Sequence, residues 1–511
     1  MLKTDFLKKT DYIFSRKGRL FFFMLALLVN IFWLYTSKIT YNEDGKALYI
    51  KGVEIEKDLS AAEHFIKTGE YSFGENSLNQ TDYTYRLPGF LFVYLPFRLF
   101  LNIHGTLTAI VLLQVLLSAM ATVSLSRIVY NLTKKPIFYY VTFILFLGSG
   151  YIQNHNFGFN REGLSTYVII FALYFLQLWN IKRKNYLIIL FTLLLTWIFL
   201  YRAFLVPPVF LIFIAILYYQ WEENKKLPLK LALLLFLPSL LFFLYWIPRN
   251  YVLTQKFIPH ETCTQGSKLS DNIVQLTQTW GSLVFWWGNA ETSWFNKPDG
   301  INGKEVSDTI MPKFLFNDTL TLDTLKKARA YYRLAEDKSI PLIQRENYDK
   351  KGVEIIHKFI VFQKEKFPCR AYVTSKLYYL FTFLNQPIGI RTCNLRYPLN
   401  VLCTFITSGI NYFVFFFGFL ASIILFFYRK SFKQLFFGQS IIFFLLIFFV
   451  CFFTIELRRI AHLFPFFLIN ALFLINIIFD KNKKIGLACL LGIILIFTGL
   501  GIYGCVNNLI W

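Results

Sequence analysis

Two carboxylates stand four residues apart in an early stretch of this 511-residue chain. Glu54 and Asp58 belong to GVEIEKDLSAAEHFIKTGEYSF, residues 52–73, and would share one face if the segment is helical. A carboxylate can accept the proton of an attacking hydroxyl, and neighbouring carboxylates raise each other's proton affinity. The stretch therefore predicts a helical acidic site with Glu54 or Asp58 as the base, whereas Glu56 and Glu63 are offset from that face and would be solvated.

Further ionisable residues stand at the ends of apolar segments, namely Glu162, Arg202, Arg249, Arg458, Arg459 and His462. A charge inside a bilayer costs about 2.5 to 3.5 kcal/mol on insertion scales, so such residues pair, line a polar cavity or extend to the headgroups. A guanidinium donates paired hydrogen bonds to phosphate and keeps its charge. Arginines gathered on one face therefore predict a cavity that holds a phosphate group near the acidic stretch.

The composition places these residues in a membrane protein. Hydrophobic residues make up 56% of the chain and aromatic residues 20%, which is more than one soluble core can bury. Several apolar runs reach the roughly 20 residues that a helix needs to cross a bilayer, and they lack the alternation of barrel strands. The net charge of +23 lies largely in clusters between these runs, so it indicates topology and not a nucleic-acid partner. We expect an all-α polytopic fold.

The positions of the basic clusters predict about eleven spans, with the N-terminus in the cytoplasm and the C-terminus outside. The predicted spans are 20–37, 106–126, 136–152, 162–180, 186–201, 204–221, 229–247, 409–427, 436–454, 461–479 and 485–505. Counting the apolar run 88–103 as a crossing would place Lys134 and Lys135 outside. We therefore expect this run to be an interfacial or re-entrant helix.

Two connections are long, and both are predicted to be external. Residues 1–247 would form an N-terminal transmembrane module with a catalytic external loop at 38–105, residues 248–408 a large and mainly helical external loop, and residues 409–511 the last transmembrane helices. Cysteines expected on the oxidising side are Cys263, Cys369, Cys393 and Cys403. One pair could form a disulfide there, but their spacing fits no zinc motif.

Taken in order, these motifs resemble the family 39-like glycosyltransferases of the membrane-embedded GT-C superfamily, which include protein O-mannosyltransferases and aminoarabinose transferases. That family carries an acidic residue in the first external loop, then an aromatic residue, a small residue, a Gly-Tyr-Ser-like stretch and Arg-x-Pro-Gly. The corresponding features here are Glu54, Asp58, Ala62, TGEYSF and YRLPGFLF, followed by Glu162, YRAFLVPP, WIPRNYVLTQKFIP and LRRIAHLFPF. Glu54 replaces the usual Asp and Asp58 the usual aromatic residue, so the identity of the base stays open.

The resemblance implies inverting transfer of a sugar from a polyprenyl-phosphate-linked donor to a hydroxyl acceptor at the outer membrane face. The acceptor would be a lipid, a glycan or a protein. The implied base is Glu54 or Asp58; the implied phosphate-binding residues are Arg202, Arg249, Arg458 and Arg459; and the implied substrate contacts are Arg86, Glu162, Asn250 and His462. No metal ligands or cofactor are indicated, although a divalent metal stays open. Abundant Phe, Ile, Lys, Asn and Tyr are consistent with an AT-rich bacterial genome and hence a bacterial cytoplasmic membrane.

Two other functions fit a polytopic protein with these charges. A flippase for lipids or glycans would place ionisable residues near the bilayer midplane, often on broken helices in matching halves. A glycan transferase of the O-antigen-ligase type would act at the same membrane face, with its main catalytic loop late in the chain. The acidic stretch early in the chain favours the glycosyltransferase that the resemblance implies.

Overall fold

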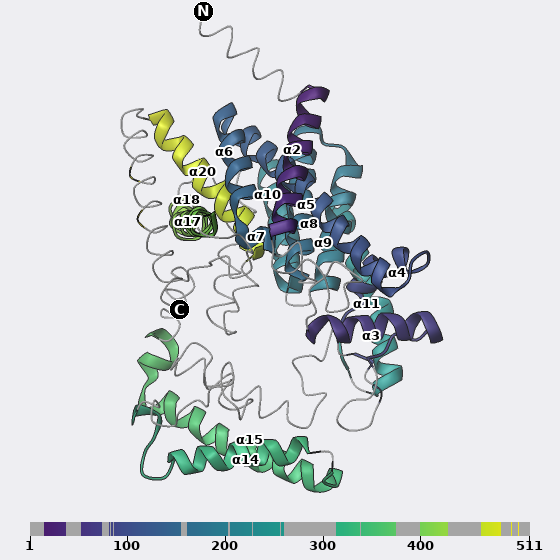
Figure 1. The fold of residues 1–511 in the computed structure, drawn as a ribbon, viewed down its shortest axis with the longest axis vertical. Helices are drawn as coiled ribbons and strands as arrows, with labels where there is room; N and C mark the ends of the chain where they lie inside the picture. The colour runs from purple at the N-terminus through teal and green to yellow at the C-terminus, as the bar shows by residue number, and fades with distance from the viewer. Residues whose placement is uncertain are drawn as a thin grey trace, which may run out of the picture.

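The computed structural model describes residues 15–36, 53–73, 81, 83–84, 86–154, 161–202, 205–226, 228–255, 257–259, 313–337, 339–374, 399–427, 461–481, 492 and 499. These residues form helices and connecting turns, with no strand among them. Most of the helices pack into one bundle (Figure 1). The prediction of an all-α protein is confirmed for this part of the chain.

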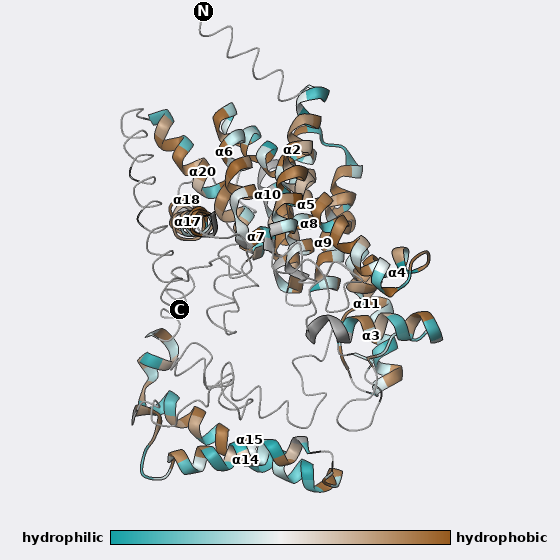
Figure 2. Cartoon of the chain, in the orientation of Figure 1, coloured by the Kyte–Doolittle hydropathy of each residue, from teal (hydrophilic) through white to brown (hydrophobic). Residues whose placement is uncertain are grey.

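The bundle contains both long and short apolar helices. They are α2 (Arg16–Thr36), α5 (Ile103–Thr133), α6 (Pro136–Gly148), α7 (Gly150–Asn154), α8 (Arg161–Lys182), α9 (Asn185–Tyr201), α10 (Val206–Asn224), α11 (Leu229–Thr254), α17 (Leu399–Tyr412), the π-helix η5 (Phe413–Phe417), α18 (Gly418–Phe427) and α20 (Phe464–Lys481). Except for α2, which packs in two smaller apolar clusters, their inner faces share a large apolar core that includes Phe146, Phe199 and Phe213. Apolar residues also cover much of their length (Figure 2), and Leu240 and Leu244 stay exposed. Lipid, and not water, suits such an outer surface.

Among the described residues, six helices are long and apolar enough to cross a membrane: Arg16–Tyr35, Ile103–Thr133, Gly163–Lys182, Leu229–Thr254, Val401–Leu425 and Ala461–Lys481. Each overlaps a predicted span, as expected of a multi-pass membrane protein. The predicted spans at 136–152, 186–201 and 204–221 coincide with shorter apolar helices. Those at 436–454 and 485–505 fall on residues that, apart from 492 and 499, lie outside the description.

One predicted span is interrupted at Ser149, which adopts an extended backbone between α6 and α7. The break frees carbonyl groups inside the apolar bundle, where water cannot satisfy them. Gln153 Nε2 donates to the carbonyl oxygen of Phe146 at 3.1 Å, and Trp33 Nε1 donates to that of Leu147 at 3.0 Å. Side chains from α7 and α2 therefore compensate for the interruption.

Helices α3 (Val53–Thr68) and α4 (Gly89–Arg98) close one end of the bundle, which we call the α3 end. There α3 runs across the bundle and not along it (Figure 1). An apolar cluster fixes this arrangement, and it consists of Ala61, Ala62, Tyr71, Leu87, Phe90, Leu91, Tyr94, Leu107, Ile110, Leu164, Tyr201 and Trp246. Gly89 allows α4 to approach α9 closely, because a Cβ atom there would lie 2.4 Å from the Tyr201 backbone. The α3 end therefore gathers α4, α5, α8, α9 and α11 around α3.

A helical hairpin is formed by α14 (Leu322–Glu336) and α15 (Leu342–Lys366), within the segment predicted as a mainly helical loop. It has an apolar core of its own, to which Leu325, Ile356 and Phe359 belong. Its remaining surface is largely hydrophilic (Figure 2). Helices α11 and α17 extend beyond the predicted limits of this loop at 248 and 408.

The placement of α4 gives a test of topology. This helix has ten residues and so measures about 15 Å, half of the apolar thickness of a bilayer. We expect a thiol introduced by His104→Cys to react with an impermeant reagent from outside, and a thiol introduced by Lys134→Cys to react only from the cytoplasm. Labelling at position 104 from the cytoplasm alone would show that 88–103 crosses the membrane and that the predicted span count is wrong.

Candidate functional site

Asp58 is an interior acid at the α3 end. The neighbouring Ala61 and Ala62 are fully buried in the apolar cluster, and this face of α3 also carries Asp58, which is 3% exposed. Arg86 Nη1 donates to Asp58 Oδ2 at 3.4 Å. Moving a carboxylate out of water costs roughly several kcal/mol of solvation free energy, so a buried acid needs such a partner. Glu54 lies in α3 one helical turn before Asp58, as predicted.

Arg249 holds two points of the acidic loop, the connection between α3 and α4, against α11. Its Nη2 donates to the carbonyl oxygen of Tyr71 at 2.6 Å, and its Nη1 donates to that of Tyr83 at 3.2 Å. Nη1 also donates to Asn250 Oδ1 at 2.9 Å, and the guanidinium lies 4.6 Å from the ring centroid of Trp246. This contact with the loop was not anticipated from the sequence, and the contact of Arg249 with phosphate stays a prediction.

Asn250 supports this arrangement from the interior. The side chain is fully buried, and its Nδ2 donates to the carbonyl oxygen of Ile258 at 2.9 Å. It therefore connects Arg249 to the segment that follows α11. The structure gives Asn250 a positioning contact, while its predicted contact with substrate stays a prediction.

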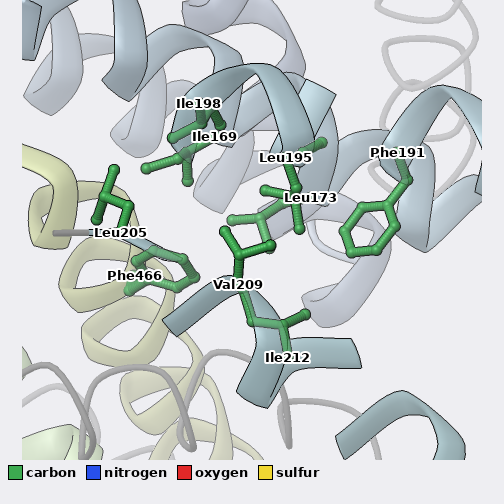
Figure 3. Close-up of a pocket in the computed structure, with 10 residues that line it drawn as sticks. Ile169, Leu173, Phe191, Leu195, Ile198, Leu205, Val209, Ile212 and Phe466 are labelled. Carbon is green, nitrogen blue, oxygen red and sulfur yellow. The ribbon is translucent and has the colours of Figure 1, made fainter. Parts of the chain in front are cut away.

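Arg202 ends α9 beside an apolar cavity. Its amide donates to the carbonyl oxygen of Ile198 at 2.8 Å, and its carbonyl oxygen accepts from the amide of Leu205 at 3.0 Å. Both neighbours line a small cavity of about 30 Å³ among α8, α9, α10 and α20 (Figure 3). Its lining is Ile169, Ala172, Leu173, Phe191, Leu195, Ile198, Leu205, Val209, Ile212 and Phe466. Because α9 rises about 17 Å from Phe191 to Arg202, the lining extends from the α3 end deep into the bundle.

His462 lies at a junction between helices. Its Nε2 and Ser165 Oγ are 2.6 Å apart, which links the turn before α20 to α8, and the ring is 1% exposed. Glu162 is in the first turn of α8, three residues before Ser165. Both therefore belong to the α3 end, because Leu164 of the same turn is part of its apolar cluster. The predicted phosphate ligands Arg458 and Arg459 lie outside the described residues.

The prediction that Glu63 is solvated is wrong. Glu63 Oε1 accepts from the Tyr94 hydroxyl at 2.6 Å and from Arg98 Nε at 2.7 Å, and Arg98 Nη2 lies 3.3 Å from Oε2. Burial alone would raise the pKa of Glu63, but the hydrogen bonds from Arg98 and Tyr94, together with the charge of Arg98, lower it below its ordinary value. The carboxylate is therefore ionised at neutral pH. Glu63 and Arg98 are 35 positions apart, and no helical or strand spacing in the sequence relates residues at that separation. The sequence therefore contains no local indication of this contact.

The possible disulfide does not join the two cysteines that the structure describes, Cys369 and Cys403. Cys369 is exposed beyond the end of α15, and Cys403 lies in α17. Cys263 and Cys393 are not among the residues described. In the described part of the chain, no three His, Cys, Asp or Glu side chains gather closely enough to hold a metal ion.

Comparisons of the chain with protein-family models, with curated proteins and with solved structures give no match. Fold and site therefore define a class and not a family. The part of the chain that the structure describes is all-α, and its long apolar helices are those of a multi-pass membrane protein. One end of its bundle carries a buried acid–arginine pair, an arginine bound to loop carbonyls and an apolar cavity that begins beside a third arginine.

Proposed function

We propose that the protein is a membrane glycosyltransferase that uses a sugar linked to polyprenyl phosphate. The observation that carries the proposal is the position of Arg202 between Ile198 and Leu205, which line an entirely apolar cavity. A polyprenyl-phosphate donor has the matching chemistry, with an anionic head joined to a long apolar chain. A guanidinium suits the phosphate, and the apolar lining suits the chain, for which the side chains around the cavity would have to move apart.

The acids and arginines of the α3 end provide the groups that the reaction needs. Glu54 or Asp58 takes the proton of the acceptor hydroxyl while the acceptor oxygen bonds to the anomeric carbon. The bond from that carbon to the phosphate oxygen breaks, and polyprenyl phosphate leaves with the electron pair. Attack opposite the leaving group inverts the anomeric centre. Asp58 would have to exchange its contact with Arg86 for the hydroxyl if it is the base.

Arginines would stabilise the departing phosphate, whose negative charge grows in the transition state. In an apolar setting this electrostatic effect is usually large. The proposed phosphate-binding residues are Arg202, Arg249, Arg458 and Arg459, and the proposed substrate contacts are Arg86, Glu162, Asn250 and His462. The acceptor would be the hydroxyl of a lipid, a glycan or a protein.

The distribution of basic residues supports an external location for this site. Lys134 and Lys225 cap the C-terminal ends of α5 and α10, and Arg183 directly follows α8. These helix ends lie opposite the α3 end, where α5 and α8 begin. Lys135 lies at the same end of the bundle, where it forms an ion pair with Asp480 near the end of α20. Basic residues favour the cytoplasmic side, so we propose that the α3 end faces outward from a bacterial cytoplasmic membrane.

A flippase for lipid-linked glycans is a second candidate. The break between α6 and α7 favours it, because discontinuous spans are typical of transporters. A flippase would bind the same amphiphile in the same cavity but would move it without cleaving it. A glycan transferase of the O-antigen-ligase type would cleave it and differ in acceptor. Product analysis therefore separates both transferases from the flippase.

The cavity is tested by filling it. We expect Leu173→Trp to weaken binding of a polyprenyl-phosphate sugar about tenfold, because excluding two chain methylenes costs about 1.6 kcal/mol. Binding and sugar release would be measured with purified protein in lipid nanodiscs. The matched control is Leu240→Trp, which adds the same ring at a 53% exposed position outside the cavity. Equal donor binding in both variants would contradict the cavity assignment, and movement of an intact donor would favour the flippase.

A further inference from the structure

Helix α3 is joined to the α4 segment at two charged points. The first is the contact between Asp58 and Arg86, three residues before α4 begins. The second is the contact between Glu63 and Arg98, the last residue of α4. In both contacts the acid belongs to α3. Arg86 precedes α4, and Arg98 is its last residue. Because five residues of helix separate the two acids by about 7.5 Å, the pairs together fix both the position and the rotation of α3.

The second point is held by several hydrogen bonds. The arginine fork meets both carboxylate oxygens of Glu63, and Tyr94 donates a third hydrogen bond. Arg98 Nη1 also donates to the carbonyl oxygen of Leu101 at 3.0 Å, which ties the fork to the end of α4. Tyr94 is fully buried and stacks on Phe90 at 5.5 Å between ring centroids. Paired, charge-assisted bonds of this kind impose geometry as well as attraction.

We propose that Glu63, Tyr94 and Arg98 form a positioning clasp that keeps the acidic helix in its working position during sugar transfer. This inference rests on the function proposed above. A reaction that uses Asp58 or Arg86 has to weaken their mutual contact while substrate is bound. The clasp then leaves α3 attached at its other charged point. The three clasp residues need not touch substrate, because they act through the helix that carries Glu54 and Asp58.

The rest of the contact between α3 and the bundle makes a pivoting motion the expected result of losing the clasp. Among the described side chains of α3, Ala61 and Ala62 are buried in the apolar cluster, and Leu59 and Phe65 pack against it while partly exposed. Such apolar contacts lack the fixed direction of hydrogen bonds. The helix ends at Gly69, whose φ of +76° forms a turn that glycine adopts without strain. Beyond that turn, the next fixed point is the Tyr71 carbonyl held by Arg249.

The kinetic test uses a double-mutant cycle. We expect Glu63→Gln and Arg98→Gln each to lower kcat about ten- to a hundredfold with the KM for donor unchanged, since misplacing a reacting group by about 1 Å has effects of this size. The double variant should be no slower than the slower single variant, because both changes remove the same contact. Arg98→Lys, which keeps the charge but loses the fork, should recover part of the rate. The control is Glu346→Gln, the same change at an exposed site on α15.

A second measurement is independent of activity. Nitroxide labels at Ser60→Cys on α3 and Phe92→Cys on α4, both exposed positions, report the distance between the helices after the seven native cysteines are replaced. We expect a narrow distance distribution that broadens in Glu63→Gln and keeps its width in Glu346→Gln. An unchanged distribution, or additive losses of kcat in the double variant, would overturn the clasp. Absence of sugar transfer by the wild-type protein would instead overturn the proposed function and leave the distance measurement to decide the clasp.

Discussion

Removing the catalytic carboxylate is expected to lower sugar transfer by about 10²- to 10⁴-fold while membrane insertion and donor binding are retained. The two variants are Glu54→Gln and Asp58→Asn, and the one that removes the base should show the larger loss. Asn at position 58 still offers an oxygen to Arg86 Nη1, 3.4 Å from the present carboxylate oxygen, so the buried arginine keeps an acceptor. Turnover in nanodiscs at saturating donor, beside thermal stability, provides the measurement.

A comparison with Arg86→Gln separates catalysis from structure. If Asp58 serves only to pair with Arg86, losing either partner should impair the protein to a similar extent, since each change removes one member of the same buried ion pair. If Asp58 is the base, its amide should lose far more turnover than stability. A double variant of Glu54→Gln and Asp58→Asn that transfers sugar at the wild-type rate would remove the acidic stretch from the mechanism.

The second large effect is expected for Arg249→Ala. This change removes the guanidinium hydrogen bonds to the Tyr71 and Tyr83 carbonyl oxygens and the contact with the Trp246 ring. A charge-assisted hydrogen bond contributes about 1.5 to 3 kcal/mol, so donor use should fall about ten- to a hundredfold. Arg249→Lys should recover only part of this loss, because an amine lacks the planar fork that reaches two carbonyls. Donor binding and transfer are measured for each variant.

Arg202→Ala is the matched comparison, because Arg202 flanks the cavity. Its loss leaves the hydrogen bonds from Arg249 to the Tyr71 and Tyr83 carbonyl oxygens in place. We expect Arg202→Ala to weaken donor binding alone. Arg249→Ala should in addition make the acidic loop more sensitive to protease, since its backbone loses two donors. Unchanged donor affinity in both alanine variants would place the phosphate elsewhere.

Sequence reasoning succeeded where the physical signal is local. Apolar length predicted the long helices. Four-residue spacing placed Glu54 and Asp58 on one face on the condition that the segment is helical, and α3 is a helix. Sequence reasoning failed at Glu63 because Arg98 lies in another helix, and contact across helices follows from packing and not from spacing. The cavity beside Arg202 was missed for the same reason, since its lining comes from four helices.

The break at Ser149 shows a different limit of sequence reasoning. Residues 136–152 are apolar enough for one span, and Ser149 stands between two glycines that permit either a continuous or an interrupted helix. Trp33 and Gln153 donate hydrogen bonds to the carbonyl oxygens that the interruption leaves free. No sequence motif signals either bond. Hydrophobicity therefore located this segment without revealing its shape.

The same break bears on how the protein is made. Synthesis proceeds from the N-terminus, so α2 with Trp33 is already present when Leu147 reaches the membrane and its carbonyl group needs a donor. The hydrogen bond of the Ser149 hydroxyl forms later, because its acceptor, the Asn411 side-chain oxygen at 2.9 Å, lies 262 residues further along the chain. A ribosome therefore completes most of the protein before this polar contact can form. Until then, the first half of the bundle is an intermediate whose interior lacks this polar contact.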